Sequence, residues 1–164
     1  MIDKQYLLQL LKKETATTLK VMRAFPEDSL AFKPHERSSS ARDVMRTCTF
    51  GLILIQSYVL GEKIDRAIFQ TYAPDKLSTL MADFEKTAGS VASGVERLSD
   101  SDLAKSFEFV GRKTEADEFI VRMILDQVHH RGQLSVYIRL AGGKVPSIYG
   151  PSADDPGTNF QQKS

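Results

Sequence analysis

The chain has 164 residues, of which 41% are hydrophobic and 26% are charged, as is typical of one globular domain with a sizeable core. With 22 Lys and Arg against 21 Asp and Glu, it lacks the basic excess of a nucleic-acid-binding surface, so we expect no nucleic-acid partner. One cysteine excludes an internal disulfide, and the sequence predicts neither a signal peptide nor a membrane span. We therefore expect a cytoplasmic protein.

The first half of the chain contains two segments with apolar residues at the three- and four-residue steps of an amphipathic helix. The first segment covers residues 2–24 and the second covers residues 40–60, where Gly61 is a suitable C-terminal stop. Ser40 and Asp43 have the spacing of a capping box, with Asp in the place where Glu or Gln is preferred. These features predict two helices joined by a loop.

The second half predicts two more helices. One covers residues 75–98, with Asp75 as a possible cap, and the other covers residues 115–141, with a possible cap at Thr114. Residues 99–113 are expected to form a polar link between them. The last helix should stop at Gly142 and Gly143, because glycine tolerates the left-handed conformation of a helix end.

The connection between the second and third helices, residues 62–75, is unusually long for a bundle and could contain a helical turn before Pro74. It allows the second and third helices to run parallel. We therefore predict an all-α, up-down four-helix bundle with a long crossover between helices two and three. Residues 1–150 should form one domain, followed by an irregular tail at 151–164.

Two polar side chains on the fourth predicted helix, Asp126 and His130, are four residues apart and project from one face. Their stripe also contains Phe119, Met123, Gln133 and Tyr137. Polar groups in an apolar sector need a partner. A carboxylate and an imidazole at this spacing could bind a divalent metal such as zinc or nickel. The alternative is an Asp–His hydrogen bond with a purely structural role.

Other polar residues have simpler interpretations. His129 points about a quarter turn away from the pair, so we expect it at the surface or an interface. Cys48 could be a nucleophile, but a free cysteine on an apolar helix face is usually a small core residue. Arg131 and Gln133 are expected to hydrogen-bond to neighbouring helices. His35, next to a proline in a loop, should be solvated.

Three segments carry a resemblance to a known family: HHRGQL at 129–134, YIR at 137–139 and VPSIYG at 145–150. They resemble the last helix and exit loop of DinB-like four-helix bundles, and the similarity extends over nearly the whole chain up to Gly150. That family typically places one metal-binding histidine on the second helix and two on the fourth. Here His130 matches one of these, Asp126 stands four residues earlier, and Thr47 stands at the second-helix position, with Cys48 next to it if the alignment shifts by one residue.

The resemblance implies a metal-dependent enzyme, either a hydrolase or a thiol transferase, but this chain keeps one of the three expected ligands. We predict a DinB-like protein of unassigned activity with a degraded metal site at Asp126, His130 and Thr47, which binds no zinc or nickel tightly. Two alternatives remain open: a metal-dependent hydrolase or thiol transferase, and a non-enzymatic dimeric module that binds a small molecule or another protein. Catalytic residues cannot be named from the sequence.

The fourth predicted helix also carries apolar residues on the side away from Met123 and Leu134. They are Val121, Leu125, Val128 and Val136. A helix with two apolar sides needs two partners, and Phe50 and Ile53 of the second helix lie off its core face in the same way. These residues predict a homodimer, unless the exit loop and tail cover them.

Overall fold

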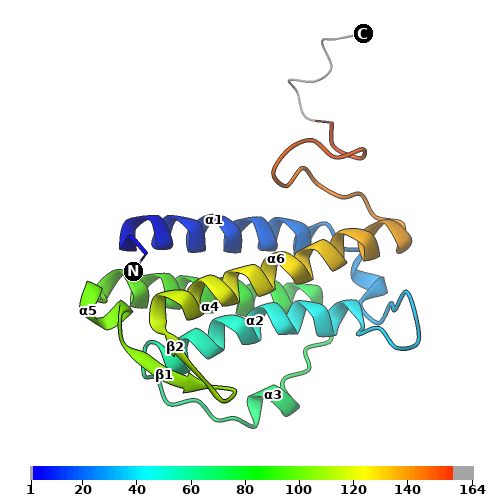
Figure 1. Ribbon diagram of the computed structural model, residues 1–164. Helices are drawn as coiled ribbons and strands as arrows, with labels where there is room; N and C mark the ends of the chain where they lie inside the picture. Colours follow the sequence, from blue (N-terminus) through cyan, green and yellow to red (C-terminus); the bar gives the residue numbers. More distant parts are fainter. Residues whose placement is uncertain (1, 157–164) are drawn as a thin grey trace.

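A computed structural model describes residues 2–156 of the chain. Four long helices lie side by side (Figure 1). They are α1 (Lys4–Arg23), α2 (Ala41–Tyr58), α4 (Leu77–Arg97) and α6 (Ala116–Leu140). Helix α1 packs against α4 and α6, and helix α2 also packs against α4 and α6. Figure 1 shows that α2 and α4 run in one direction and α1 and α6 in the other. The predicted bundle with a long crossover is confirmed.

Shorter elements lie in the connections. They are η1 (Glu27–Ser29), α3 (Ile68–Thr71), α5 (Asp100–Leu103), β1 (Ser106–Phe109) and β2 (Arg112–Glu115). The turn expected before Pro74 is α3. The expected polar link at 99–113 is wrong, because it forms α5 and an antiparallel hairpin of β1 and β2. The hairpin turns at Val110 and Gly111, whose φ angles are 49° and 70°, as a type I′ turn requires.

The predicted helix caps have different outcomes. Ser40 caps α2, since its Oγ accepts a hydrogen bond from the Asp43 amide at 3.2 Å and donates one to Asp43 Oδ2 at 2.6 Å. The caps expected at Asp75 and Thr114 are wrong. Lys76 occupies the N-cap position of α4 and has no capping side-chain bond, while Thr114 is paired with Phe107 in the hairpin.

The deepest stripe of α6 differs from the stripe predicted around Asp126. It consists of Ile120, Ile124, Gln127, Arg131, Leu134 and Ile138, all nearly inaccessible to solvent. Asp126, His130 and Gln133 are only partly buried. The centre of the buried face of α6 lies at Gln127 and Arg131, each of which directly follows a member of the candidate metal pair. Asp126 and His130 therefore lie at the edge of the core.

The exit from α6 follows the predicted glycine stop. Gly142 has a φ of 83°, and the Gly143 amide donates to the Ile138 carbonyl at 2.8 Å. Residues 151–156 contain no helix or strand, and Ser152 Oγ donates to the Val145 carbonyl at 2.6 Å. The remainder of the predicted tail, 157–164, lies outside the described residues, and the domain boundary at residue 150 stays a prediction. Among the helices of residues 2–156, none has the length and apolarity needed to cross a bilayer.

Candidate functional site

A pocket of about 470 Å³ lies between α2 and α6, at the side where the hairpin packs. Its lining residues are Thr47, Phe50, Gly51 and Leu54 from α2, Arg122, Met123, Leu125 and Asp126 from α6, and Phe109 from β1. The structure therefore brings Thr47 and Asp126 to one pocket, although they are far apart in the sequence. We call this the α2–α6 pocket.

Asp126 and His130 form an ion pair on one face of α6, with 3.5 Å between Asp126 Oδ2 and His130 Nε2. The other ring nitrogen of His130, Nδ1, lies 3.0 Å from Gln133 Oε1. Both neighbours accept hydrogen bonds, so they favour the doubly protonated imidazolium. The interaction with Asp126 raises the pKa of His130 although burial opposes it. The same interaction with His130 lowers the pKa of Asp126.

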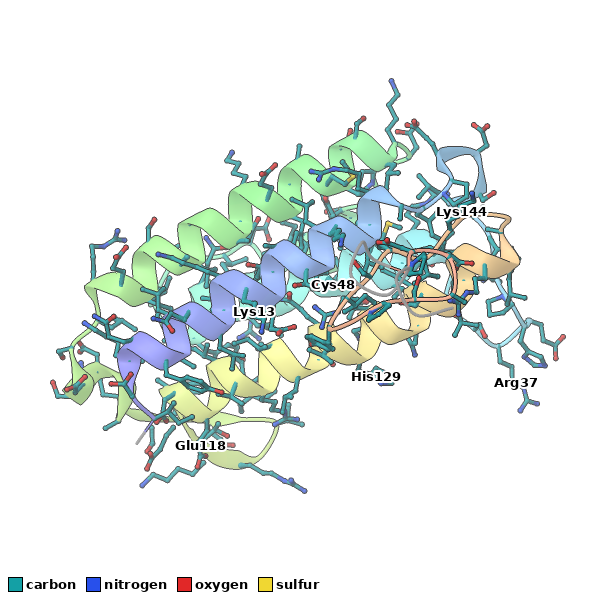
Figure 2. All side chains as sticks on the ribbon, turned by 90° about the horizontal axis from the view of Figure 1, so that it is seen from above. Lys13, Arg37, Cys48, Glu118, His129 and Lys144 are labelled. Atoms are coloured by element: carbon teal, nitrogen blue, oxygen red, sulfur yellow. The ribbon has the colours of Figure 1, made fainter. Side chains whose placement is uncertain are left out.

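The second-helix candidates, Thr47 and Cys48, are both engaged elsewhere. Thr47 Oγ1 donates to the Asp43 carbonyl one helical turn earlier, at 2.9 Å. Cys48 is fully buried, and Figure 2 shows it in the interior of the bundle. Burial first, and the Asp126 charge second, raise the pKa of Cys48 to about 12. Its thiol is therefore protonated at neutral pH, which confirms the interpretation of Cys48 as a small core residue.

The donor set does not fit a family-type metal site. Zinc sites in proteins have four protein ligands, or three and a water. Asp126 and His130 supply one carboxylate and one imidazole, and Thr47 adds only a neutral hydroxyl. Within residues 2–156 no three His, Cys, Asp or Glu side chains are grouped so that they could hold a metal ion.

Arg122 and Phe109 are among the lining residues that were not predicted as site residues. The Arg122 guanidinium lies 5.3 Å from the centre of the Phe109 ring, as in a cation–π contact. Phe109 reaches the pocket from the hairpin that the sequence analysis missed. Alternation of Phe107 and Phe109 before Gly111 is the sequence signal that could have revealed it.

Arg131 has the helix-linking role that was predicted. It is 1% exposed, and its Nη2 lies 2.7 Å from Glu14 Oε2 on α1. Tyr149 of the exit loop donates to the same carboxylate oxygen at 2.6 Å, and its ring centre lies 5.0 Å from the Arg131 guanidinium carbon. The arginine of HHRGQL and the tyrosine of VPSIYG therefore meet on α1 and tie the exit loop to the bundle.

The remaining histidines lie at the surface, as predicted. His129 is exposed on the outer side of α6 (Figure 2), and its Nε2 lies 3.2 Å from Gln133 Nε2. Gln133 thus bridges the two histidines and does not reach a neighbouring helix. The exposed His35 accepts a hydrogen bond at Nδ1 from the Arg37 amide at 3.1 Å.

Several known proteins resemble this chain. A DinB-like protein from Bacillus cereus ATCC 10987 is 25% identical with a TM-score of 0.76, over 87% of this chain and 95% of that one. The DinB-like protein YjoA from Bacillus subtilis is 20% identical with a TM-score of 0.70, over 86% and 95%. YfiT from Bacillus subtilis, described as a probable metal-dependent hydrolase with an unusual four-helix bundle topology, is 14% identical with a TM-score of 0.68, over 87% and 91%.

Sequence comparison adds one relative and the family. The uncharacterized protein YrdA of Bacillus subtilis (strain 168) is 37% identical over 57 residues, which are 35% of this chain and 34% of YrdA. That match therefore spans about a third of the relative's length. The sequence model of the DinB family matches residues 1–163, and this chain belongs to the DinB family.

Proposed function

We propose that this DinB-family protein binds a small molecule in the α2–α6 pocket and that its family-type metal site is degraded. The observation that carries the proposal is the convergence of Thr47 and Asp126 on one pocket. The pocket therefore offers polar groups that can orient a small molecule. Only Asp126 and His130 remain as side chains that could bind a metal.

The lining of the pocket favours an amine with an apolar body. Asp126 is the carboxylate on the wall, and the interaction with His130 lowers its pKa, so it is ionised at neutral pH. Its Oδ2 is paired with His130, which leaves Oδ1 to accept from a ligand, while the Arg122 guanidinium on the same wall lies over the Phe109 ring. Phe50, Leu54 and Met123 provide apolar surface beside it. Small-molecule sites commonly combine such walls with a few polar groups that fix orientation.

Benzylamine is a suitable probe, because it joins a protonated amine to an aromatic ring. We expect it to raise the melting temperature of the wild-type protein and not that of Asp126→Asn or Gly51→Leu. The leucine would extend into the pocket, since a Cβ at Gly51 would lie 3.9 Å from Met123 Sδ. Asp28→Asn, an exposed carboxylate in η1, is the control and should respond like wild type. Equal shifts in all four proteins would contradict the proposal.

A metal-dependent hydrolase or thiol transferase is the second candidate. YfiT is described as a probable metal-dependent hydrolase, and the pairing of Asp126 with His130 on one helix face favours this reading. The protonated, buried Cys48 does not favour a thiol nucleophile. Elemental analysis of protein purified without a histidine tag separates the candidates: one equivalent of zinc or nickel, lost in His130→Ala, would favour the enzyme.

A homodimer through the outer side of α6 is also proposed. Of the four residues on which the dimer was predicted, Leu125 and Val136 are 61% and 56% exposed, whereas Val121 and Val128 are half-buried. Leu140, which was not among them, is 58% exposed. The supporting observation from α2 was wrong, because Phe50 packs against Phe69 of the chain's own crossover, with 5.0 Å between ring centroids, and Ile53 is 7% exposed. Light scattering should give twice the chain mass of 18.3 kDa, and Val136→Lys should halve it. A monomer mass for the wild type at high micromolar concentration would reject the dimer.

A further inference from the structure

A second pocket, of about 290 Å³, lies between α2 and α4. Its lining residues are Thr49, Ile53 and Gln56 from α2, Ile68 and Tyr72 from the crossover, and Asp83, Lys86, Thr87 and Ser90 from α4. It shares no lining residue with the α2–α6 pocket. We call it the α2–α4 pocket.

Thr49 gives this pocket an unsatisfied polar group. The residue is 2% exposed, and its hydroxyl has no hydrogen-bond partner within the described part of the chain. Several other helical threonines bond back to the preceding turn, as Thr47 does to Asp43 at 2.9 Å and Thr87 to Asp83 at 2.7 Å. A buried hydroxyl without a partner is destabilising. A polar ligand group that reaches this oxygen from the α2–α4 pocket would satisfy it.

Two hydrogen bonds across the α2–α4 pocket use the donors of Tyr72 and Gln56, and acceptor lone pairs remain on its wall. The Tyr72 hydroxyl donates to Asp83 Oδ2 at 2.9 Å, and the Gln56 amide donates to Ser90 Oγ at 3.2 Å. Burial and the bond to Asp83 raise the pKa of Tyr72, so the phenol keeps its proton. Lone pairs remain on the oxygens of Asp83, Tyr72 and Thr49. Such a surface suits a ligand that donates several hydrogen bonds, as an ammonium group does.

The charged residues of α4 indicate which group the ligand carries at the end away from its ammonium. Lys86 follows Asp83 by three residues, a spacing at which opposite charges often pair. Among residues 2–156 neither of them takes part in an ion pair. Lys86 is exposed at the mouth, where its ammonium could meet a carboxylate. Ile53 and Ile68 supply apolar wall between the two ends.

We propose that the α2–α4 pocket binds a small amino acid with an apolar side chain. The amino group contacts Asp83, Tyr72 and Thr49, the carboxylate contacts Lys86, and the side chain packs against the two isoleucines. An amino acid uses the acceptors, Lys86 and the apolar wall together.

The ligand class is tested by isothermal titration of the Asp126→Asn variant, which lacks the carboxylate of the α2–α6 pocket, with L-valine, isobutylamine and isovaleric acid. The second compound lacks the carboxylate of valine and the third lacks its amino group. We expect valine to bind with the highest affinity, and each analogue to bind at least about tenfold more weakly, because the loss of a single charge-assisted hydrogen bond already has that effect. Absence of valine binding at millimolar concentration, or equal binding of all three compounds, would overturn the proposal.

Substitutions on opposite sides of α2 locate the binding. Thr49→Val should weaken valine binding about fivefold and raise the melting temperature of the free protein, because it removes an unsatisfied buried hydroxyl. Asp83→Asn should weaken valine binding without changing the response to benzylamine. Thr47→Val, which makes the same change in the α2–α6 pocket, is the matched control and should leave valine binding unchanged. Equal effects of Thr47→Val and Thr49→Val on valine binding would contradict the assignment.

Discussion

Arg131 and Glu14 form a buried ion pair whose side chains are 2% and 6% exposed. Removing one partner of such a pair leaves an uncompensated charge in the core. We therefore predict that Arg131→Met lowers the free energy of unfolding by about 3–5 kcal/mol, as measured by urea denaturation. Tyr149 would lose its cation–π contact at the same time, so the exit loop should become more susceptible to proteolysis.

The control for this prediction is Arg139→Met. Arg139 Nε lies 2.9 Å from Asp154 Oδ2, but the arginine side chain is 50% exposed. Exposed pairs contribute about 0–1 kcal/mol, so the loss should be small. Equal losses in the two variants would show that the Arg131 pair is solvated and not part of the core.

The pair of Asp126 and His130 predicts a pH-dependent contribution to stability. The pKa of His130 is raised from 6.5, so its contribution is complete below that value and is lost as pH rises through the folded pKa. The pKa of Asp126 is lowered from 3.8, so its contribution is present above that value and is lost as pH falls through the folded pKa. The destabilisation caused by Asp126→Asn should therefore be larger near pH 5.5 than near pH 8.5.

Titration of the His130 imidazole by NMR measures the same coupling directly. Wild-type His130 should titrate above 6.5, and Asp126→Asn should lower its pKa, because Asp126 is the largest cause of the shift. The charges of His129 and Arg122 also lower the pKa of Asp126. A His130 pKa that is unchanged in Asp126→Asn would show that the pair is not formed in solution.

At the scale of elements, the hairpin turn contains a conformation that its residue disfavours. Val110 has a φ of 49° and is 80% exposed, so no packing compensates for the left-handed backbone. This conformation costs a β-branched residue about 1–2 kcal/mol, whereas Asn adopts it readily. We predict that Val110→Asn raises the free energy of unfolding by about 1 kcal/mol, as measured by chemical denaturation. Val110→Thr keeps the β-branch and should give no gain; an equal gain would refute the strain.

The long helices could be predicted because their apolar residues recur at helical steps that the core confirms, as at Leu77, Leu80 and Phe84. The hairpin was missed because its strands are four residues long and largely polar, so that the alternation of Phe107 and Phe109 is its main sequence signal. The centre of the α6 face was also misplaced. Gln127 and Arg131 occupy core positions at which an apolar periodicity predicts hydrophobic residues. The predicted buried face of α6 was therefore displaced toward Met123.

Two of the residues that line the α2–α6 pocket could be predicted from the sequence, and the others could not. The resemblance to DinB-like bundles named Thr47 and Asp126, and the structure places both at the α2–α6 pocket. Periodicity alone could not relate two residues on different helices. It could not name Phe109 either, because that side chain reaches the pocket only through the hairpin. Nor could it reveal Thr49, whose distinguishing property is a hydroxyl that does not bond to its own helix.

At the scale of the whole molecule, α2 separates two pockets. The hairpin contributes to the wall of the α2–α6 pocket, and the crossover contributes to the wall of the α2–α4 pocket. The parallel arrangement of α2 and α4 requires a crossover that runs the length of the bundle (Figure 1). The connection that defines the topology therefore also supplies Ile68 and Tyr72 to a pocket.

We propose that the metal site of this DinB-family protein is degraded, because Thr47 and Asp126 stand where the family resemblance expects histidines. Isothermal titration of zinc or nickel into metal-stripped, tag-free protein tests it most directly. We predict weak, exchangeable binding by the wild type, since two ligands are too few for a tight site. Thr47→His combined with Asp126→His should bind one equivalent far more tightly, because both positions line the same pocket. Stoichiometric, submicromolar binding by the wild type that is abolished by His130→Ala would show that the metal site is intact.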